Sequence, residues 1–189
     1  GTDDAGADGM ALVLHNDPAG PEALGIAGTT GFTGLADGFA IDLDTYLNNG
    51  GSGDIPSDHT NFARTDGTLL TTPSALANLE DGAWHRVVLS WDAAAQKLIY
   101  SVDGVTVGTL SEDIATAYLG GESFARFGVT AGTGGAFNTH QAEIVGIDGT
   151  FEGGRVVAWG DIPPPPPEAD VVLNSSGLTA TLNGSATFD

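Results

Sequence analysis

The chain has 189 residues and a very acidic composition, with 25 Asp and Glu residues against 5 Lys and Arg residues and a formal net charge of −20. Nucleic acids and anionic membranes repel so negative a chain, so neither is expected as a partner, whereas cations are attracted. The absence of cysteine excludes disulfide bonds and thiolate metal sites.

The length suits one domain with a single core, with or without a short appendage. No apolar run is long enough to cross a bilayer, so membrane insertion is not expected. Residues 1–20 lack the basic start and apolar stretch of a signal peptide, and any export signal is expected to lie outside this chain.

Short segments rich in β-branched and aromatic residues follow one another along the chain, separated by Gly, Asp, Asn and Pro clusters that favour turns. They predict strands at 9–17, 39–46, 84–92, 97–104, 105–110, 123–132 and 140–151. Such a series predicts an all-β fold, an antiparallel sandwich or barrel. A short helix is expected at 73–80, and 112–120 is either a helical turn or an irregular strand.

A proline-rich segment at 162–170 interrupts this pattern. Its five consecutive prolines, 163–167, cannot join a sheet ladder and favour an extended polyproline conformation. The predicted organisation is a sandwich over 1–161, a spacer over 162–170, and a further strand segment over 171–189.

The strand predicted at 39–46 carries acids on one face only. Side chains at alternate positions of a strand share a face, so Asp42, Asp44 and Tyr46 point one way. Ile41 and Leu43 point the other way. Two carboxylates so close together repel each other and lose solvation unless a cation compensates them.

The loop that follows this strand adds further oxygen ligands and one imidazole. A hard cation such as Ca²⁺ suits the carboxylates, the amide and the backbone carbonyl contributed by Asp44, Asn48, Asp54 and Tyr46. An imidazole beside carboxylates suits a transition-type ion, which indicates a second site that shares two carboxylates with the first and is formed by Asp42, Asp44, Asp54 and His59. The alternative is an acidic strand that merely faces water, but the ordered run Asp, Asp, Asn, Asp, His is unlike a chance arrangement.

At this stretch the sequence resembles the legume-type (L-type) lectins. "DLDTYLN" at 42–48 is similar to the family's metal loop, and an Asp followed by Pro and then His stands in the family's order at Asp54, Pro56 and His59. Asp42 stands where the family usually has Glu, and the loop before Asp54 is one residue longer; both departures concern the second ion. The resemblance implies a concanavalin-like jelly roll that binds Ca²⁺ and a second ion, either Ca²⁺ or Mn²⁺.

Three other segments carry the resemblance, which covers most of residues 7–152. "ADGMALVL" at 7–14 resembles the strand in which the family has a cis Ala–Asp peptide, here Ala7–Asp8, and an Asp that accepts sugar hydroxyls. "GTTGFTGLADGFAIDLDTY" at 28–46 implies Gly31 as a backbone donor to the sugar.

The third segment is "FGVTAGTGGAFNTH" at 127–140, which resembles a strand and the variable loop after it. The resemblance implies that the sugar-binding residues are Asp8, Gly31, Asn48, Gly134, Gly135 and Ala136. Phe32 and Phe137 are loop aromatics that either stack on a sugar ring or hold their loops in place.

These observations predict calcium-dependent binding of cell-surface glycans or polysaccharide by an extracellular or cell-surface module of a bacterial adhesin. The alternative is a laminin-G-like structural or protein-binding module with a stabilising calcium site. A glycoside hydrolase would need paired carboxylates, for which Asp42 and Asp44 are candidates by spacing. Catalysis is not expected, because the metal loop accounts for these acids.

The two ends of the chain carry a further expectation. Gly1 lies only six residues before Ala7, so the strands that open such lectins are expected to be missing from the front, which leaves the N-terminal strands incomplete or permuted. "LTATLNGSATFD" at 178–189 resembles such an opening strand. Either it begins a tandem copy or it returns to this domain, and we expect 171–189 to pair with the body of this domain or with a neighbouring copy.

Overall fold

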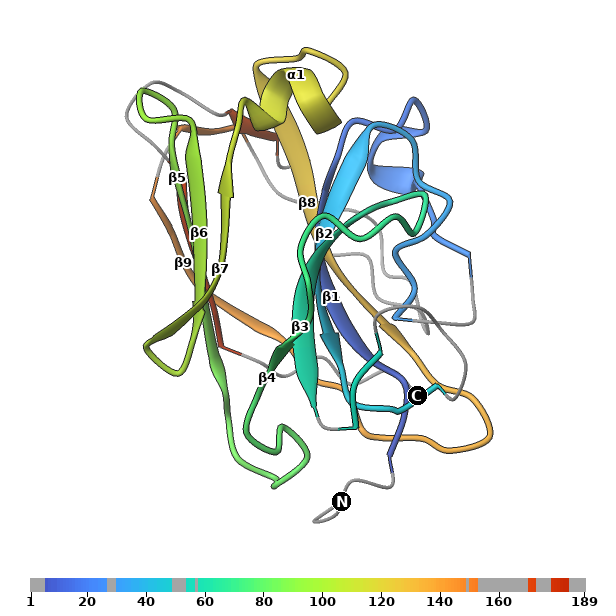
Figure 1. Cartoon of the computed structure of the whole chain (residues 1–189). Coiled ribbons are helices and arrows are strands. Elements are labelled where there is room, and N and C mark those ends of the chain that lie inside the picture. The colour runs from blue at the N-terminus through green and yellow to red at the C-terminus, as the bar shows by residue number, and fades with distance from the viewer. Residues whose placement is uncertain are drawn as a thin grey trace.

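The computed structural model describes residues 6–26, 30–48, 54–56, 58–148, 150–152, 170–172 and 178–183. Within these residues the chain forms two antiparallel sheets that face each other, as Figure 1 shows. The predicted all-β antiparallel sandwich is therefore confirmed. No helix among the described residues has the length and apolar character needed to cross a membrane.

One sheet has seven strands and the other has five. The seven-stranded sheet contains, in spatial order, β10 (Thr150–Glu152), β11 (Asp170–Val172), β8 (Phe124–Gly132), β1 (Gly9–His15), β2 (Gly38–Asp44), β3 (His59–Arg64) and β4 (Ser74–Ala75). The five-stranded sheet contains β7 (Val105–Ser111), β6 (Lys97–Val102), β5 (Arg86–Asp92), β12 (Leu178–Asn183) and β9 (Glu143–Asp148). Two short helices, η1 (Gly20–Glu22) and α1 (Ile114–Tyr118), complete the described elements, and α1 lies across one end of the sandwich (Figure 1).

The main core fills the space between the sheets. Alternation on β5 buries Val87, Leu89 and Trp91 against residues of the facing sheet. Phe62 of that sheet meets Tyr100 of β6 edge to face, with ring centroids 4.7 Å apart. The Tyr100 hydroxyl shares a 2.6 Å hydrogen bond with Thr60, and burial raises the pKa of Tyr100 to about 12.

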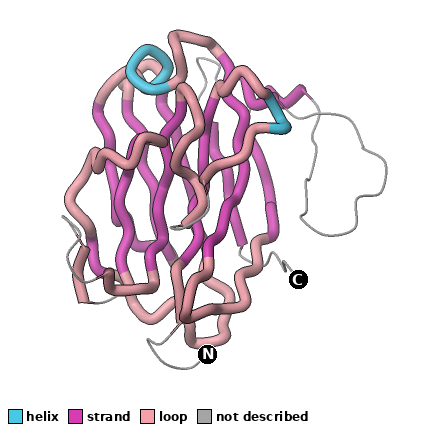
Figure 2. Tube along the Cα trace, turned by 90° about the vertical axis from the view of Figure 1, so that its right-hand side faces the viewer, coloured by secondary structure: helices cyan, strands magenta, loops and turns pink. Residues whose placement is uncertain are grey.

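The outer face of the seven-stranded sheet is covered as well. Phe32 and Leu35, from the loop that precedes β2, pack over the small side chains of Ala11, Val13 and Ala40. Both faces of β1 are therefore buried, which explains why its sequence is almost continuously apolar. Figure 2 shows the strands side by side, with loops at their ends and across the face turned to the viewer.

The predicted helix at 73–80 is wrong, because this stretch contains only the short strand β4 and irregular chain. Its backbone donors bond to Asp58 instead of to helix carbonyls: Leu76 N–H donates to the Asp58 carbonyl at 2.6 Å and Leu79 N–H donates to the carboxylate at 2.5 Å. At 112–120 the helical alternative is correct, since α1 forms there with Asp113 as its N-cap.

The single strand predicted at 140–151 is in fact two strands in different sheets, β9 and β10. The chain changes sheet between Asp148 and Thr150, which the apolar pattern alone did not indicate. The sequence also gave no indication of β3, whose segment "HTNFAR" has one large apolar residue and becomes a strand through pairing with β2.

Strands from the end of the chain complete both sheets. β12 lies between β5 and β9, and β11 pairs with β8 and β10. Of the two accounts of the tail, pairing with the body of this domain is the arrangement observed, and strand exchange with a neighbouring copy finds no support in these strands. The expected proline spacer, 162–170, lies outside the described residues except for Asp170.

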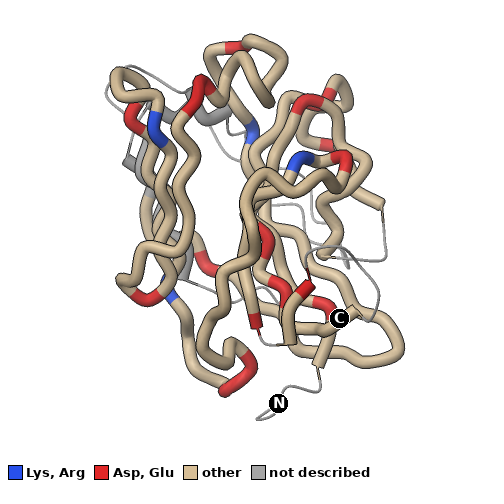
Figure 3. The backbone as a smooth tube through the Cα atoms, in the orientation of Figure 1, with Lys and Arg blue, Asp and Glu red and all other residues tan. Residues whose placement is uncertain are grey.

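Acidic residues occur on the loops and strand ends of both sheets, while Lys and Arg residues are few (Figure 3). Two loop carboxylates, those of Asp81 and Asp103, contact His85, which lies next to β5. His85 Nδ1 lies 2.8 Å from Asp103 Oδ2, and His85 Nε2 lies 3.2 Å from Asp81 Oδ1. Burial lowers the pKa of His85, but the hydrogen bonds and charges of Asp103 and Asp81 outweigh burial and raise it above 6.5.

A pH-dependent contribution to stability follows. The contribution of protonated His85 to the free energy of unfolding is fully present below pH 6.5. It is lost as the pH rises through the raised pKa of His85 in the folded state. We expect His85→Gln to lower the free energy of unfolding by up to about 1 kcal/mol at pH 5.5 and by less at pH 8.5, measured by urea denaturation. His15→Gln is the control. Because burial lowers the pKa of His15, the effect of this substitution on the free energy of unfolding should change with pH in the opposite direction. An equal effect of His85→Gln at both pH values would contradict this assignment.

Candidate metal and sugar-binding site

Sheet register brings the acidic residues of β2 beside β3. Asp44 stands opposite His59, and Asp42 stands opposite Asn61. Ile41 and its neighbours on the other face pack into the core between the sheets, as the strand period predicts. His59, expected in a loop, is instead the first residue of β3, so the register of two strands fixes its position relative to Asp44.

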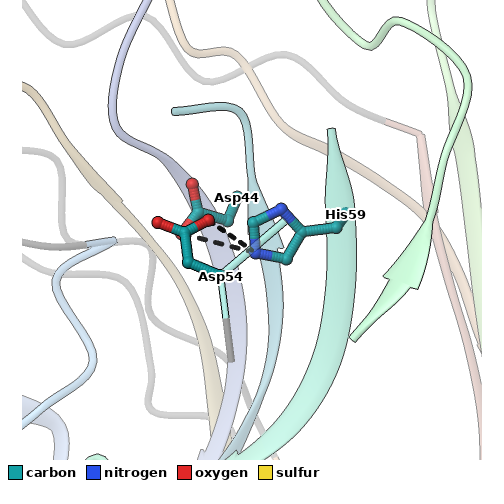
Figure 4. A group of neighbouring side chains, drawn as sticks. All are labelled: Asp44, Asp54 and His59. Atoms are coloured by element: carbon teal, nitrogen blue, oxygen red, sulfur yellow. Dashed lines mark ion pairs between the residues drawn. The ribbon is translucent and has the colours of Figure 1, made fainter. Parts of the chain in front are cut away.

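Three of the predicted ligands form a compact group. One ligand atom from each of Asp44, Asp54 and His59 lies within 4.8 Å of the other two. His59 Nε2 is 3.9 Å from Asp44 Oδ2 and 3.6 Å from Asp54 Oδ1. Figure 4 shows both carboxylates and the imidazole turned toward one another.

The two carboxylates divide their oxygens in the same way. Asp44 Oδ1 accepts a 2.8 Å hydrogen bond from Tyr46 N–H, and Asp54 Oδ2 accepts one from Asn48 N–H. The other oxygen of each carboxylate faces His59. The oxygens that accept backbone hydrogen bonds hold the loop, and the other oxygen of each carboxylate is directed at His59 Nε2.

A metal ion fits this donor set. Asp54 Oδ1 is buried and has no hydrogen-bond donor, and the side chain of His59 is only 3% exposed. A buried carboxylate oxygen without a donor, beside a second carboxylate, is costly unless a cation compensates it. Two carboxylates and one imidazole suit a divalent ion.

Two further predicted ligands lie on the loop between Asp44 and Asp54. The Tyr46 carbonyl accepts a 3.3 Å hydrogen bond from the Asn48 side-chain amide. Tyr46 and Asn48 are both exposed, next to the group of three. Their role as ligands stays a prediction.

Asp42 lies outside the group of three. Its Oδ1 accepts a 2.5 Å hydrogen bond from the hydroxyl of Thr30, a residue that the sequence did not single out. Burial raises the pKa of Asp42 to about 7, against the Thr30 hydrogen bond and with the help of the Asp44 charge. The role of Asp42 in a second metal site stays a prediction.

Burial also raises the pKa of Asp44, to about 6, against the hydrogen bond from Tyr46 and the attraction of His59. The negative charges of Asp54 and Asp8 add to the rise. The surroundings of Asp42 and Asp44 thus disfavour their charged forms, and a bound cation would reverse this balance.

Asp8 lies beside the loop that follows β2. The Ala7–Asp8 peptide is cis, as the resemblance implied. Asp8 N–H donates to the Gly132 carbonyl at 2.7 Å, and the Asp8 carbonyl accepts from Thr45 N–H at 3.1 Å. Backbone hydrogen bonds therefore fix Asp8 between the end of β8 and the loop that follows Asp44.

Two of the predicted sugar-binding glycines border the end of β8. A Cβ atom on Gly134 would lie 3.8 Å from each carboxylate oxygen of Asp8, so these residues are neighbours. Gly31 has a φ of 84°, and a Cβ there would lie 3.1 Å from the Ala131 carbonyl oxygen. Positive φ and this close approach together favour glycine.

The remaining predicted residues lie on the same loop as Gly134. Gly134 N–H donates to the Ala136 carbonyl at 3.0 Å, and a Cβ on Gly135 would meet no described atom within 4 Å. Phe32 is only 4% exposed and packs on the sheet, so it does not face a sugar, whereas Phe137 is 77% exposed on this loop.

Comparison with known proteins supports the likeness in sequence and in fold. The family model described as the legume lectin β-barrel domain (L-type lectin domain) matches residues 1–145. The chain is 28% identical to the pesticidal crystal protein Cry22Aa of Bacillus thuringiensis, over 80% of this chain and 25% of that protein. It therefore spans about a quarter of the length of this curated relative.

Two solved structures have a similar fold. A lectin from Bauhinia forficata in complex with GalNAc matches 100% of this chain and 69% of its own, with a TM-score of 0.53 and 13% identity. Lectin I from Ulex europaeus, in complex with the methyl glycoside of α-L-fucose, matches 98% of this chain and 65% of its own, with a TM-score of 0.54 and 13% identity. At this identity the two structures show the fold, a concanavalin-like β-sandwich.

Proposed function

The chain belongs to the legume (L-type) lectin domain family of carbohydrate-binding proteins, and we propose that it binds glycans in a calcium-dependent manner as an extracellular module of a bacterial adhesin. The observation that carries this proposal is the position of Asp8. Its carboxylate borders Gly134 on the variable loop, while its backbone is bonded to Thr45 in the loop that follows Asp44. Candidate sugar ligands and candidate metal ligands are thereby joined.

The proposed mechanism is preorganisation of the loops. Asp44 and Asp54 would hold the Ca²⁺, which would supply positive charge that compensates these two carboxylates. In this arrangement the Asp8 carboxylate, as an acceptor, and the Asn48 amide orient neighbouring sugar hydroxyls. The backbone N–H groups of Gly31 and Gly135 donate further hydrogen bonds to the sugar. Each such hydrogen bond contributes roughly 0.5–3 kcal/mol, so a single sugar binds weakly and several sites acting together supply avidity.

The proposed ligand is a cell-surface glycan or polysaccharide. The two similar lectins are in complex with GalNAc and with a fucose glycoside, which supports a sugar ring with adjacent hydroxyls as the recognised unit. For a second ion we propose Ca²⁺ or Mn²⁺ near Asp42 and His59. We propose no catalytic role for the acids, because their hydrogen bonds to the loop match ion binding.

The second candidate function is a laminin-G-like structural or protein-binding module with a stabilising calcium site. It is favoured by the fact that the three-residue group on its own accounts for loop stabilisation. In that case the ion would raise stability, and no glycan would bind.

A glycan array probed in calcium, in chelator, and in chelator followed by calcium tests the proposal. We expect binding to at least one class of glycan in calcium, loss in chelator and recovery on readdition, because the loop acids repel one another without a cation. Retention of binding in chelator would contradict the calcium dependence. Absence of glycan binding together with a calcium-dependent melting temperature would favour the structural alternative.

A further inference from the structure

A buried acid outside the metal group contacts the variable loop. Glu80, which follows β4, is only 7% exposed, and its Oε1 accepts a hydrogen bond from the side-chain amide of Asn138. Asn138 stands two residues after Ala136, so this bond fastens the far end of the loop that begins at Gly134.

The segment that leads to Asp8 packs on the same pair. A Cβ atom on Gly6 would overlap Glu80 Oε1 and Asn138 Oδ1, so only a glycine fits between them without displacement. The Glu80–Asn138 bond therefore touches both the segment that carries Asp8 and the loop that carries Gly134.

The segment that carries Glu80 is held by Asp58, the residue before β3. Asp58 accepts backbone hydrogen bonds from Leu76 and Leu79, at 2.6 Å to its carbonyl and 2.5 Å to its carboxylate. Glu80 N–H in turn donates to the side chain of Asn78 at 2.7 Å. These bonds fix the segment that presents Glu80, which explains why this stretch is not helical.

We propose that Glu80 is a positioning residue for sugar binding: its hydrogen bond to Asn138 sets the distance between the Asp8 carboxylate and the Gly134–Ala136 loop. The assignment rests on the proposed function of the site, which needs both segments to reach the same sugar ring. Glu80 itself contacts the loop rather than the sugar.

Three variants of the full chain test this role by titration with the strongest glycan found on the array. Glu80→Ala should weaken glycan binding about tenfold or more, because it removes the hydrogen bond that holds Asn138 and the end of the loop. Glu80→Gln keeps an acceptor oxygen and should restore most of the affinity. Asp81→Ala is the matched control, because Asp81 is the adjacent acid and interacts with His85 instead of the loop. It should bind as the wild type does.

A double-mutant cycle separates positioning from a general loss of structure. Glu80→Ala and Asn138→Ala should each weaken binding to a similar extent, and the double variant should be no weaker than either one, since both remove the same bond. The calcium-induced rise in melting temperature should remain in all variants. Additive losses, or Glu80→Ala binding at wild-type affinity, would overturn the proposal.

Hydrogen exchange tests the anchor, that is, the hydrogen bond by which Glu80 holds Asn138, without any sugar. In Glu80→Ala the amides of residues 134–138 should exchange at least about tenfold faster than in the wild type, while the Asp81→Ala protein should match the wild type. If the wild type binds no glycan but this exchange difference appears, the proposed function fails and the anchor stands. Unchanged exchange overturns the anchor whatever the glycan array shows.

Discussion

Asp44→Asn is expected to remove both the calcium-induced stabilisation and glycan binding. The substitution keeps the shape of the side chain and keeps Oδ1 as an acceptor for Tyr46 N–H, but it removes the negative charge that faces Asp54 and His59. Loss of an outer-shell partner of a metal lowers affinity roughly 10- to 100-fold, and loss of a direct carboxylate should cost at least as much.

Melting temperature gives the first measurement of this prediction. At calcium about 100-fold above its Kd, binding adds about 2.7 kcal/mol to the native state, which corresponds to a rise of roughly 5–11 °C for a domain of this size. The wild type should show this rise and Asp44→Asn should not. Without calcium the variant should be at least as stable as the wild type, because it no longer holds a desolvated carboxylate beside Asp54.

The control is Asp66→Asn. Asp66 Oδ1 accepts a 2.8 Å hydrogen bond from Thr68 N–H, the same local geometry as Asp44 with Tyr46, but Asp66 is exposed and outside the group of three. It should respond to calcium as the wild type does. A full calcium response in Asp44→Asn would show that the ion binds elsewhere than at this group.

Asp8→Ala is expected to abolish detectable glycan binding and to preserve calcium binding. Two hydrogen bonds to a charged acceptor, at about 1.5–3 kcal/mol each, correspond to a loss of about 100-fold or more in affinity. The hydrogen bonds that hold Asp8 in place are made by its backbone, to Gly132 and Thr45, so the loop positions should survive the substitution.

Isothermal titration with glycan and with calcium measures the two effects separately. Glu122→Ala is a suitable control, because it removes one negative charge near the start of β8, whereas Asp8 is bonded to the last residue of that strand. It should leave both affinities unchanged. Normal glycan binding by Asp8→Ala would show that the sugar site inferred from the family is misplaced, and a lost calcium response would show that Asp8 serves the ion.

Alternation along the chain was enough to predict the sandwich and the faces of β2. A period of two places Asp42 and Asp44 together whatever the rest of the chain does, and on the opposite face Ile41 lies in the core and Leu43 packs against it. The local order of acids and His after β2 likewise indicated a metal loop. The helix predicted at 73–80 was wrong, because backbone N–H groups of this segment bond to the distant Asp58 instead of to carbonyls of their own segment.

What only the tertiary structure decided are the contacts between segments far apart in the chain. The β2–β3 register sets His59 opposite Asp44, the Thr30 hydroxyl donates to Asp42, which lies outside the group of three, and β12 returns to lie between β5 and β9. The contact of Glu80 with Asn138 joins residues 58 positions apart. Local periodicity cannot specify such pairs, because each depends on how two sheets and their loops pack, while the face of a residue on its own strand depends only on its neighbours in sequence.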